Sequence, residues 1–367
     1  MSRNLLLIPE VDLKSLKKLL VHKKYKMRDT LYMKNIIENK TIFITGGTGS
    51  FGKKFVQTLL DSHNPKKVIV YSRDELKQFE MQQAWPDNGE LPIRYFIGDI
   101  RDYSRLKMAM KGVDIVVHAA ALKQVPAAEY NPFEAVKTNI IGSQNVIDAA
   151  ISNNVSHVIA LSTDKAAAPI NLYGATKLAS DKLFIAANNY KGQADIKFSV
   201  VRYGNVMGSR GSVIPFFLNQ KKSGKLTITD KKMTRFSITL KEGVDFVLFC
   251  LHRMWGGELF VPKIPSYNIN DVANAISPKA TKEYIGIRPG EKLHEEMITE
   301  TDSLNCIEFK EYFTILPSTP LWDFEKFRKE SGKDVGKKCK NGFAYNSGKN
   351  SDFLTVDNLK KLIDKEL

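Results

Sequence analysis

The feature that most constrains the fold is a glycine-rich turn between a predicted strand and a predicted helix. The β-branched run Thr41–Ile44 leads into TGGTGSFG at 45–52, and a helical pattern follows. Gly46, Gly49 and Gly52 have the spacing G-x-x-G-x-x-G. Glycines so placed permit a tight turn and let the backbone approach a pyrophosphate at the start of the helix. The turn therefore predicts a dinucleotide site; the alternative is a purely structural strand-turn-helix unit.

This unit opens an alternation of strand-like and helical segments. Apolar runs recur at residues 67–71, 94–97, 115–117, 157–161 and 198–202, and helical patterns at 133–150 and 172–189 lie between them. The alternation predicts an α/β fold with a doubly wound parallel sheet of the Rossmann kind. After residue 204 it loosens, although 212–222 and 239–254 look helical and 226–229 and 258–261 look strand-like.

We expect three regions along the chain. Residues 1–39 form a basic N-terminal extension, residues 40–204 an NADP-binding Rossmann domain to which about 236–262 return, and residues 205–367 a smaller substrate-binding region. Residues 1–33 contain eight basic and three acidic side chains, and 11–21 have the pattern of a basic amphipathic helix. We prefer to read this segment as an appendage, or as preceding a true start at Met33, because the α/β unit begins directly afterwards.

The end of the second predicted strand bears on which dinucleotide is bound. An acidic residue there accepts a hydrogen bond from the ribose 2′-hydroxyl of NAD, whereas an arginine accommodates the 2′-phosphate of NADP. Ser72 and Arg73 occupy this position, and Asp74 comes afterwards. The order favours NADP, and Lys77 supplies a second positive charge.

Other residues at strand ends are candidates for cofactor contacts. Asp99 follows the third strand and is placed either to accept from the adenine amino group or to cap a helix. After the next strand, His118 precedes Ala119, Ala120 and Ala121, whose small side chains leave room for a flat cofactor.

Four proton-handling side chains lie between Ser162 and Lys177. Asp164 and Lys165 follow the predicted strand 157–161, and Tyr173 and Lys177 are four residues apart on one face of the next helix. Ligands of open α/β sheets bind at this end of the strands. Each group alone is unremarkable, but together behind a dinucleotide turn they predict a site that combines redox chemistry with proton transfer.

Composition excludes several classes of protein. The formal charge of +15 is not accompanied by a nucleic-acid-binding motif, so we expect a lysine-rich surface and no nucleic-acid partner. Three scattered cysteines fit neither a disulfide framework nor a zinc site, which favours the cytoplasm and no metal. The apolar runs fall short of the roughly 20 residues of a membrane span. Two loop arginines, Arg210 and Arg288, suit a diphosphate clamp.

The motifs together resemble the extended short-chain dehydrogenase/reductase superfamily, on TGGTGSFG at 45–52, HAAA at 118–121 and YGATK at 173–177. More narrowly, the chain resembles the inverting UDP-N-acetylglucosamine 4,6-dehydratases of pseudaminic acid biosynthesis, the pathway that supplies flagellin glycosylation. That likeness rests on YSRDELK at 71–77, ALKQVPAAEYNP at 121–132, STDK at 162–165, RYGNV at 202–206, SRGS at 209–212, MTRF at 233–236 and IRPGEKLHE at 287–295. It is strong over about 40–300.

The resemblance implies roles for individual residues. Tyr173 takes the proton of the sugar 4-hydroxyl, Thr163 hydrogen-bonds that hydroxyl, Lys165 removes the C5 proton and Asp164 protonates the departing 6-hydroxyl. Lys177 favours the Tyr173 phenolate, and burial makes Lys165 neutral. NADP is expected to contact Gly46, Thr48, Gly49, Ser50, Phe51, Gly52, Ser72, Arg73, Asp74, Lys77, Asp99, Ile100, Ala119, Ala120, Lys123, Asn139, Tyr173 and Lys177. UDP-N-acetylglucosamine is expected to contact Lys123, Asn205, Val206, Ser209, Arg210, Thr229 and Arg288. A homo-oligomer, dimer or hexamer, is implied.

The chain departs from the family pattern at four positions. Gln124 stands where histidine is usual, Ala168 where asparagine is usual, Ser237 where tryptophan is usual, and Ala344 where one relative has glutamate. These changes leave the 2- and 4-substituents of the sugar open.

Three other functions compete with this interpretation. A retaining dehydratase is expected to have methionine in place of Tyr173, and a C4 epimerase is expected to lack the Asp164–Lys165 pair. A non-catalytic NADP sensor would have lost Tyr173 or Lys177. All four residues are present.

Overall fold

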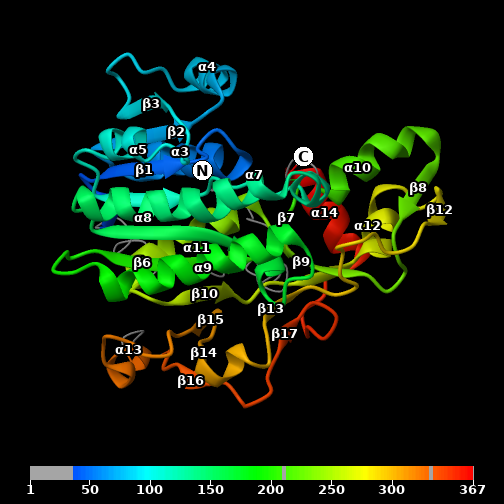
Figure 1. Ribbon diagram of the computed structural model, residues 1–367. Helices are drawn as coiled ribbons and strands as arrows, with labels where there is room; N and C mark the ends of the chain where they lie inside the picture. Colours follow the sequence, from blue (N-terminus) through cyan, green and yellow to red (C-terminus); the bar gives the residue numbers. More distant parts are fainter. Residues whose placement is uncertain (1–35, 209–211, 330–333, 367) are drawn as a thin grey trace, which may run out of the picture.

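The computed structural model describes residues 36–208, 212–329 and 334–366. Its centre is a ten-stranded sheet in the order β16-β14-β15-β10-β6-β5-β4-β1-β2-β3 (Figure 1). From β10 to β3 all neighbours are parallel. These strands are β1 (Thr41–Thr45), β2 (Lys67–Ser72), β3 (Ile93–Ile97), β4 (Ile115–His118), β5 (His157–Thr163), β6 (Lys197–Tyr203) and β10 (Leu259–Pro262).

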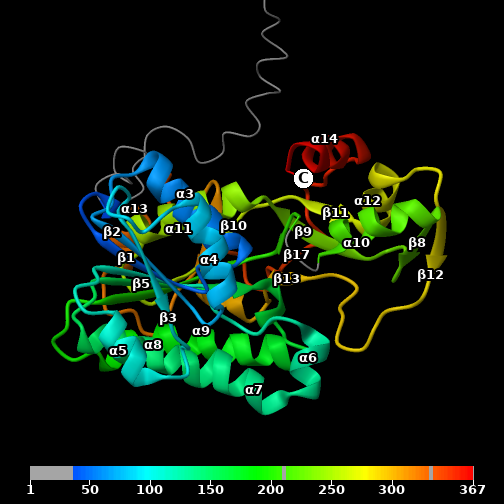
Figure 2. The ribbon, with the colours of Figure 1, turned by 90° about the horizontal axis from the view of Figure 1, so that it is seen from above.

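Helices cover both faces of the parallel part of the sheet (Figure 2). On one side lie α3 (Ser50–Ser62) and α11 (Leu240–Arg253), and on the other α5 (Tyr103–Ala109), α8 (Gly142–Ser152) and α9 (Leu172–Tyr190). Strands covered on both faces must be apolar along their whole length, and β1 is buried at all five positions. The predicted doubly wound sheet is confirmed.

Local sequence signals set where several helices begin. Thr239 and Glu242 form a capping box at the start of α11, and Asn171 accepts a hydrogen bond from the backbone N–H of Gly174 in α9. The predicted helix over 133–150 is divided into α7 (Pro132–Val136), a π-helical turn (Lys137–Ile141) and α8.

The main sheet continues beyond its parallel part. Antiparallel strands β15 (Tyr312–Ile315), β14 (Cys306–Glu308) and β16 (Lys337–Lys338) extend it past β10. Of the segment at about 236–262, which we expected to return to the Rossmann domain, β10 lies in this sheet. Residues 306–338, which we placed in the substrate-binding region, also contribute strands to it. These strands are short and lack the strand-helix alternation, so the sequence pattern did not reveal them.

A smaller lobe stands at one end of the sheet, on the right in Figure 1. It contains β8 (Lys225–Ile228), β12 (Thr281–Tyr284), α10 (Val213–Gln220), α12 (Ile269–Ile276) and α14 (Val356–Glu366). Its apolar side chains form a separate core, which includes Phe217, Leu226, Val272 and Leu359.

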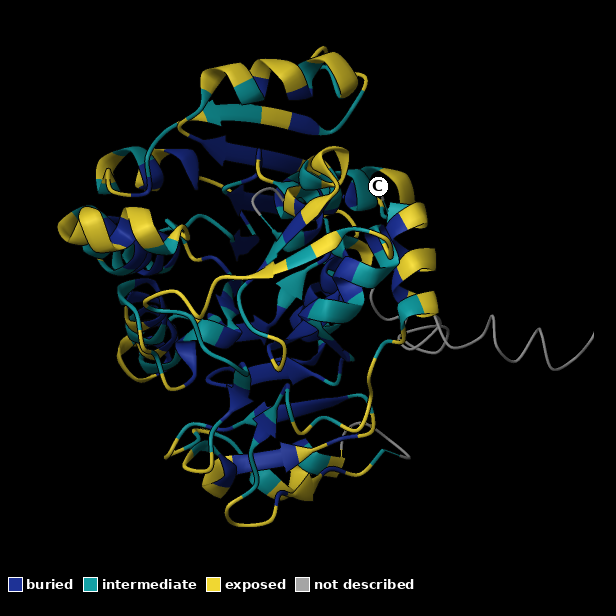
Figure 3. Cartoon of the chain, turned by 90° about the vertical axis from the view of Figure 1, so that its right-hand side faces the viewer, coloured by how far each residue is buried: buried dark blue, intermediate teal, exposed yellow. Residues whose placement is uncertain are grey.

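Short strand pairs connect the lobe to the sheet. These are β7 (Asn205–Val206) with β9 (Thr234–Ile238), β9 with β11 (Ser266–Asn268), and β13 (Glu296–Ile298) with β17 (Tyr345–Asn346). Figure 3 shows the buried strands within a shell of helices that are exposed on their outer faces. Among the described helices, none has the length and apolarity needed to cross a membrane.

Candidate functional site

A cleft of about 740 Å³ opens at the carboxyl ends of the parallel strands. Its walls come from the segments that follow β1, β2, β3, β4, β5 and β6. The order of the strands reverses beside β1, and ligands of doubly wound sheets bind at such a reversal. The volume suits a cofactor with part of a substrate.

The glycine-rich turn forms the floor of this cleft at the start of α3. Gly46 has φ +66°, and a Cβ there would lie 2.9 Å from the Ala120 backbone. A Cβ on Gly52 would lie 2.3 Å from the carbonyl oxygen of Gly47, so only glycine lets α3 pack this closely. Gly49 is the N-cap and has no side chain to occupy the first N–H groups of α3. These groups fit a pyrophosphate.

Thr45 ties the turn to the end of β4. Its hydroxyl is 2.8 Å from His118 Nδ1 and accepts from the backbone N–H groups of Ala119 and Ala120, each at 3.2 Å. Burial and the charge of Lys177 lower the pKa of His118 to about 3, so this imidazole is neutral. His118 is therefore a structural residue beside the cofactor cleft.

The end of β2 presents the residues that we assigned to the adenosine ribose. Thr48 Oγ1 donates to Ser72 Oγ at 3.0 Å, and Arg73 is half-exposed. Asp74 is the N-cap of α4 (Glu75–Ala84): it accepts from the backbone N–H of Lys77 at 3.0 Å and pairs with the Lys77 ammonium. The carboxylate of Asp74 is thus engaged within the protein.

Asp99 lies between two arginines at the same end of the cleft. It pairs with Arg101 at 2.7 Å and with Arg73 at 3.5 Å. Burial raises the pKa of Asp99, but the hydrogen bonds and charges of these arginines outweigh it and lower the pKa overall. The alternative role that we considered, a helix cap, falls to Asp102, which caps α5. Asp99 and Ile100 both line the cleft.

Lys123 and Asn139 differ in their relation to the cleft. Lys123 lines it, and burial lowers its pKa. The buried Asn139 side chain instead accepts from the N–H of Leu122 at 2.8 Å and donates to the Leu122 carbonyl and to Thr176 Oγ1. Its amide holds the loop that carries Lys123, which differs from the direct cofactor contact that we expected.

The Asp164–Lys165 pair lies where β5 ends. A short 3₁₀ turn (Asp164–Ala166) begins there, with Thr163 as its N-cap. Asp164 is 1% exposed, and its Oδ1 accepts from Thr163 Oγ1 at 2.8 Å and from Lys165 Nζ at 3.0 Å. Thr163, Asp164 and Lys165 all line the cleft.

Tyr173 and Lys177 face the same cleft from the first turns of α9, both buried. Burial raises the pKa of Tyr173 to about 12, although the charge of Lys165 and a hydrogen bond with Thr163 lower it in part. Burial lowers the pKa of Lys177. We expected Lys177 to favour the Tyr173 phenolate; in the structure Lys165 has this effect.

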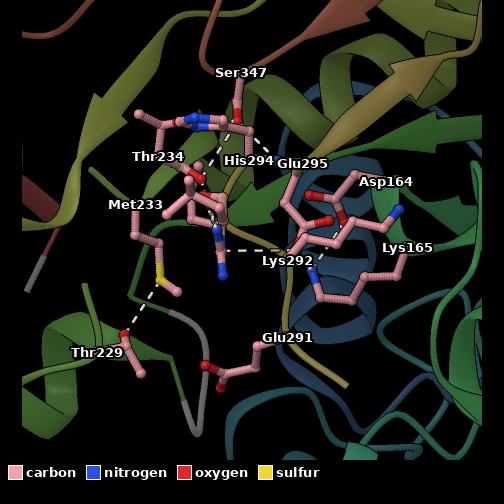
Figure 4. Close-up of polar contacts among 12 residues, drawn as sticks. Asp164, Lys165, Thr229, Met233, Thr234, Glu291, Lys292, His294, Glu295 and Ser347 are labelled. Carbon is pink, nitrogen blue, oxygen red and sulfur yellow. Dashed lines mark hydrogen bonds and ion pairs between the residues drawn. The ribbon is translucent and has the colours of Figure 1, made fainter. Parts of the chain in front are cut away.

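Two residues beside Lys165 were missed in the sequence. Glu295 Oε1 is 3.3 Å from Lys165 Nζ, and Arg235 Nε is 3.6 Å from the same oxygen. Figure 4 shows the side chains of Glu295, Asp164 and Lys165 meeting. Burial lowers the pKa of Lys165, but the charges of Asp164 and Glu295 outweigh it and raise the pKa overall, so burial alone does not make Lys165 neutral. Both missed residues lie in quoted motifs, 287–295 and 233–236, but neither motif indicates which member faces Lys165.

Only some of the residues that we assigned to the substrate lie at the cleft. Lys123, Asn205 and Val206 line the cleft. Ser209 and Arg210 lie outside the described residues. Thr229 and Arg288 are not among the described residues that line the cleft. Thr229 Oγ1 donates to Met233 Sδ, and the exposed Arg288 pairs with Glu291 at 3.7 Å.

The atypical residues occupy different places around the site. Gln124 lines the cleft, and Ser237 is buried in β9 opposite Asn205. Ala168, three residues after Lys165, has φ +44°, a backbone conformation that alanine adopts at a cost.

Comparison with known proteins agrees with this geometry. The family model described as "Polysaccharide biosynthesis protein" matches residues 42–317. The chain is 54% identical over 332 residues to the inverting UDP-N-acetylglucosamine 4,6-dehydratase of Campylobacter jejuni, covering 90% of this chain and 98% of that protein.

Two further comparisons extend the likeness. A UDP-glucose 4-epimerase of Rickettsia akari is 43% identical over 305 residues, covering 81% and 89% of the two chains. The crystal structure of Pen from Bacillus thuringiensis is similar with a TM-score of 0.80 and 40% identity, covering 90% and 98%. The resemblance inferred from the motifs is confirmed, and the chain belongs to the polysaccharide biosynthesis protein family.

Proposed function

We propose that the protein catalyses the NADP-dependent inverting 4,6-dehydration of UDP-N-acetylglucosamine. The observation that carries the proposal is the Asp164–Lys165 ion pair, 3.0 Å long, in the same cleft as Tyr173 and a dinucleotide turn. Oxidation of a sugar needs the turn and the tyrosine, and elimination of water needs a further acid and base. The 54% identity to the Campylobacter enzyme supports the same reaction.

NADP fits the residues at the cofactor end of the cleft. The turn from Gly46 to Gly52 would hold the pyrophosphate at the start of α3. Arg73, with Lys77, would meet the 2′-phosphate, because Asp74 is engaged as a helix cap. Bound there, NADP would supply the hydride acceptor for C4 and the hydride donor for C6. We expect Arg73→Ala to weaken binding of NADP more than that of NAD in titration calorimetry; equal losses would contradict this assignment.

Tyr173 would accept the proton of the 4-hydroxyl during oxidation at C4. Its raised pKa means that the phenolate is scarce near neutral pH unless further positive charge is close. Lys165 and the hydrogen bond with Thr163 both act in that direction. The first half of the reaction is therefore expected to accelerate as the pH rises.

Elimination across C5 and C6 would use the ion pair. The 4-ketone acidifies the C5 proton, which a neutral Lys165 can remove as the C6–O bond breaks. Transfer of one proton along the 3.0 Å contact from Lys165 Nζ to Asp164 Oδ1 gives a neutral base and a protonated acid together. The proton on Asp164 Oδ1 then passes to the departing 6-hydroxyl, which leaves as water, while the buried Oδ2 has no hydrogen-bond partner among the described residues. Reprotonation of C5 from the opposite face inverts that carbon.

The wider setting is part of the same proposal. The keto-deoxy product would enter pseudaminic acid biosynthesis and flagellin glycosylation, and the enzyme would act in the cytoplasm as a homo-oligomer, a dimer or a hexamer. The absence of a membrane-spanning helix among the described helices is compatible with this setting.

A C4 epimerase is the second candidate, because the Rickettsia akari protein with that name is 43% identical. Incubation with UDP-N-acetylglucosamine in deuterated water and NMR of the product separates the two. We expect a 4-keto-6-deoxy sugar with deuterium at an inverted C5. A C4 epimer without loss of water would establish the epimerase, and a retained C5 configuration would exclude inversion.

A further inference from the structure

Lys165 is surrounded by more charge than a simple acid-base pair requires. Besides Asp164, it faces the carboxylate of Glu295, which is 2% exposed and 3.3 Å away. Arg235, 8% exposed, lies on the far side of that carboxylate at 3.6 Å. Two cations and two anions therefore meet in one chain of contacts, in which Asp164, Glu295 and Arg235 are buried and Lys165 is partly buried. Buried charges are costly unless they are paired, so each of these side chains is expected to be held close to its partner.

Glu295 is fixed by the C-terminal segment of the chain. Its backbone N–H donates to Ser347 Oγ at 2.9 Å, and the N–H of Ser347 donates to the Glu295 carbonyl at 2.8 Å. Ser347 Oγ is also 2.8 Å from Thr234 Oγ1, beside Arg235 (Figure 4). Arg235 in turn donates to the carbonyls of Thr234 and Leu293 at 2.7 and 3.2 Å. Segments far apart in the sequence thus place this carboxylate.

Glu295 lies outside the described lining of the cleft, unlike the proposed reacting groups. Asp164, Lys165 and Tyr173 line the cleft, whereas Glu295 is not among the described lining residues. Glu295 is connected to this lining by its contact with Lys165.

We propose that Glu295, with Arg235 as its counter-ion, is a positioning residue that orients Lys165 toward the cleft and biases the proton of the Asp164–Lys165 pair toward the lysine. This inference rests on the proposed dehydratase function. The Glu295 carboxylate stabilises the charged amine, and Arg235 offsets part of that effect so that the proton can still pass to Asp164. The titratable and charged groups facing Lys165 from the surrounding elements are Asp164, Tyr173, Arg235, Tyr267, Lys292 and Glu295.

The test compares Glu295→Gln with the wild type and with Glu296→Gln, the same substitution at the next residue. Deuterium exchange at C5 of the sugar is measured between pH 6 and 10 by NMR. Oxidation at C4 of the sugar is followed by the absorbance of the NADPH that it forms. We expect Glu295→Gln to slow C5 exchange about tenfold to a hundredfold, because Lys165 is misplaced. We also expect the alkaline rise of that exchange to begin about one pH unit lower, because the charge beside Lys165 is lost. We expect the rate of C4 oxidation in Glu295→Gln to change less than threefold. In Glu296→Gln, both rates are expected to change less than threefold.

Glu295→Asp keeps the charge but shortens the side chain. It is expected to lower the rate of C5 exchange while leaving its pH midpoint as in the wild type, and it carries the test if Glu295→Gln does not fold. An unchanged rate and midpoint in Glu295→Gln, or a displaced midpoint in Glu295→Asp, would overturn the proposal. A wild-type protein that forms no keto-deoxy sugar would instead refute the proposed function.

Discussion

Lys165 and Lys177 lie twelve residues apart at the same cleft, yet their surroundings oppose each other. Lys165 is 25% exposed and lies between the carboxylates of Asp164 and Glu295, whose charges outweigh burial and raise its pKa. Lys177 is 3% exposed, and burial lowers its pKa with partial opposition from Asp181. Asp181 is shared with Ser162 and Arg202, at 2.7 and 3.3 Å.

The difference teaches that burial alone does not decide the charge of a lysine. Burial lowers the pKa of both amines, and the number of nearby carboxylates reverses the outcome at Lys165 alone. Lys165 is held as a cation that can pass its proton to Asp164. Lys177 lies in surroundings that disfavour a cation, beside the neutral His118. The pairs that we propose for elimination and for oxidation therefore differ in their electrostatics.

Replacement of each lysine by methionine gives the largest contrast in stability. Lys165→Met leaves two buried carboxylates without their shared cation, and we expect the free energy of unfolding at pH 7 to fall by about 3 kcal/mol. Lys177→Met removes a costly buried amine, and we expect a change of less than about 1 kcal/mol. Urea unfolding of both variants measures the difference. Equal losses would mean that the two environments do not differ as described.

The loss of stability at acid pH tests whether His118, beside Lys177, is held neutral. Because the pKa of His118 is about 3 in the folded protein, below its ordinary value, the unfolded chain binds a proton first as the pH falls. The stability due to neutral His118 is lost as the pH falls from about 6.5 toward 3. At pH 5 the loss is about 2 kcal/mol relative to neutral pH. We expect His118→Asn to lose less stability than the wild type between pH 7 and pH 5 in urea unfolding. The same loss in both proteins would show that His118 is not held neutral.

The smallest expected effect concerns the loop after Lys165. Ala168 has φ +44°, and glycine adopts this conformation without the steric cost of a Cβ. We expect Ala168→Gly to raise the free energy of unfolding by about 0.5–1 kcal/mol. Ala167→Gly is the matched control, with φ −82°, and is expected to lower stability. A destabilised Ala168→Gly protein would contradict the strain assigned to this loop beside the ion pair.

The sequence predicted the parts of the molecule that depend on local patterns. The glycine turn, the parallel strands and the start of α9 follow from spacing and capping within short segments, and the structure places them as expected. Tyr173 and Lys177 share a face because they are four residues apart in one helix.

What the sequence did not predict depends on contacts between distant segments. Glu295 reaches Lys165 across 130 residues, and its place is set by Ser347 near the end of the chain. The charge of Lys165 follows from that contact, so burial alone gave the wrong direction for its pKa. Arg288 looked suited to a phosphate by residue type, but in the structure it pairs with Glu291 outside the cleft lining.

The central claim is that Tyr173 with Lys177 serves oxidation at C4, whereas Asp164 with Lys165 serves elimination. The most direct measurement follows NADPH absorbance after mixing Lys165→Met or Lys177→Met protein, loaded with NADP, with UDP-N-acetylglucosamine. Lys165→Met is predicted to form NADPH more slowly than the wild type, because the charge that lowers the pKa of Tyr173 in part is lost, but this NADPH persists because elimination is blocked, and product is made about 10²–10⁴-fold more slowly. Lys177→Met, which lacks the amine expected to contact NADP, is predicted to form little NADPH. Product formation by Lys165→Met at the wild-type rate, or absence of NADPH in that variant, would contradict the division.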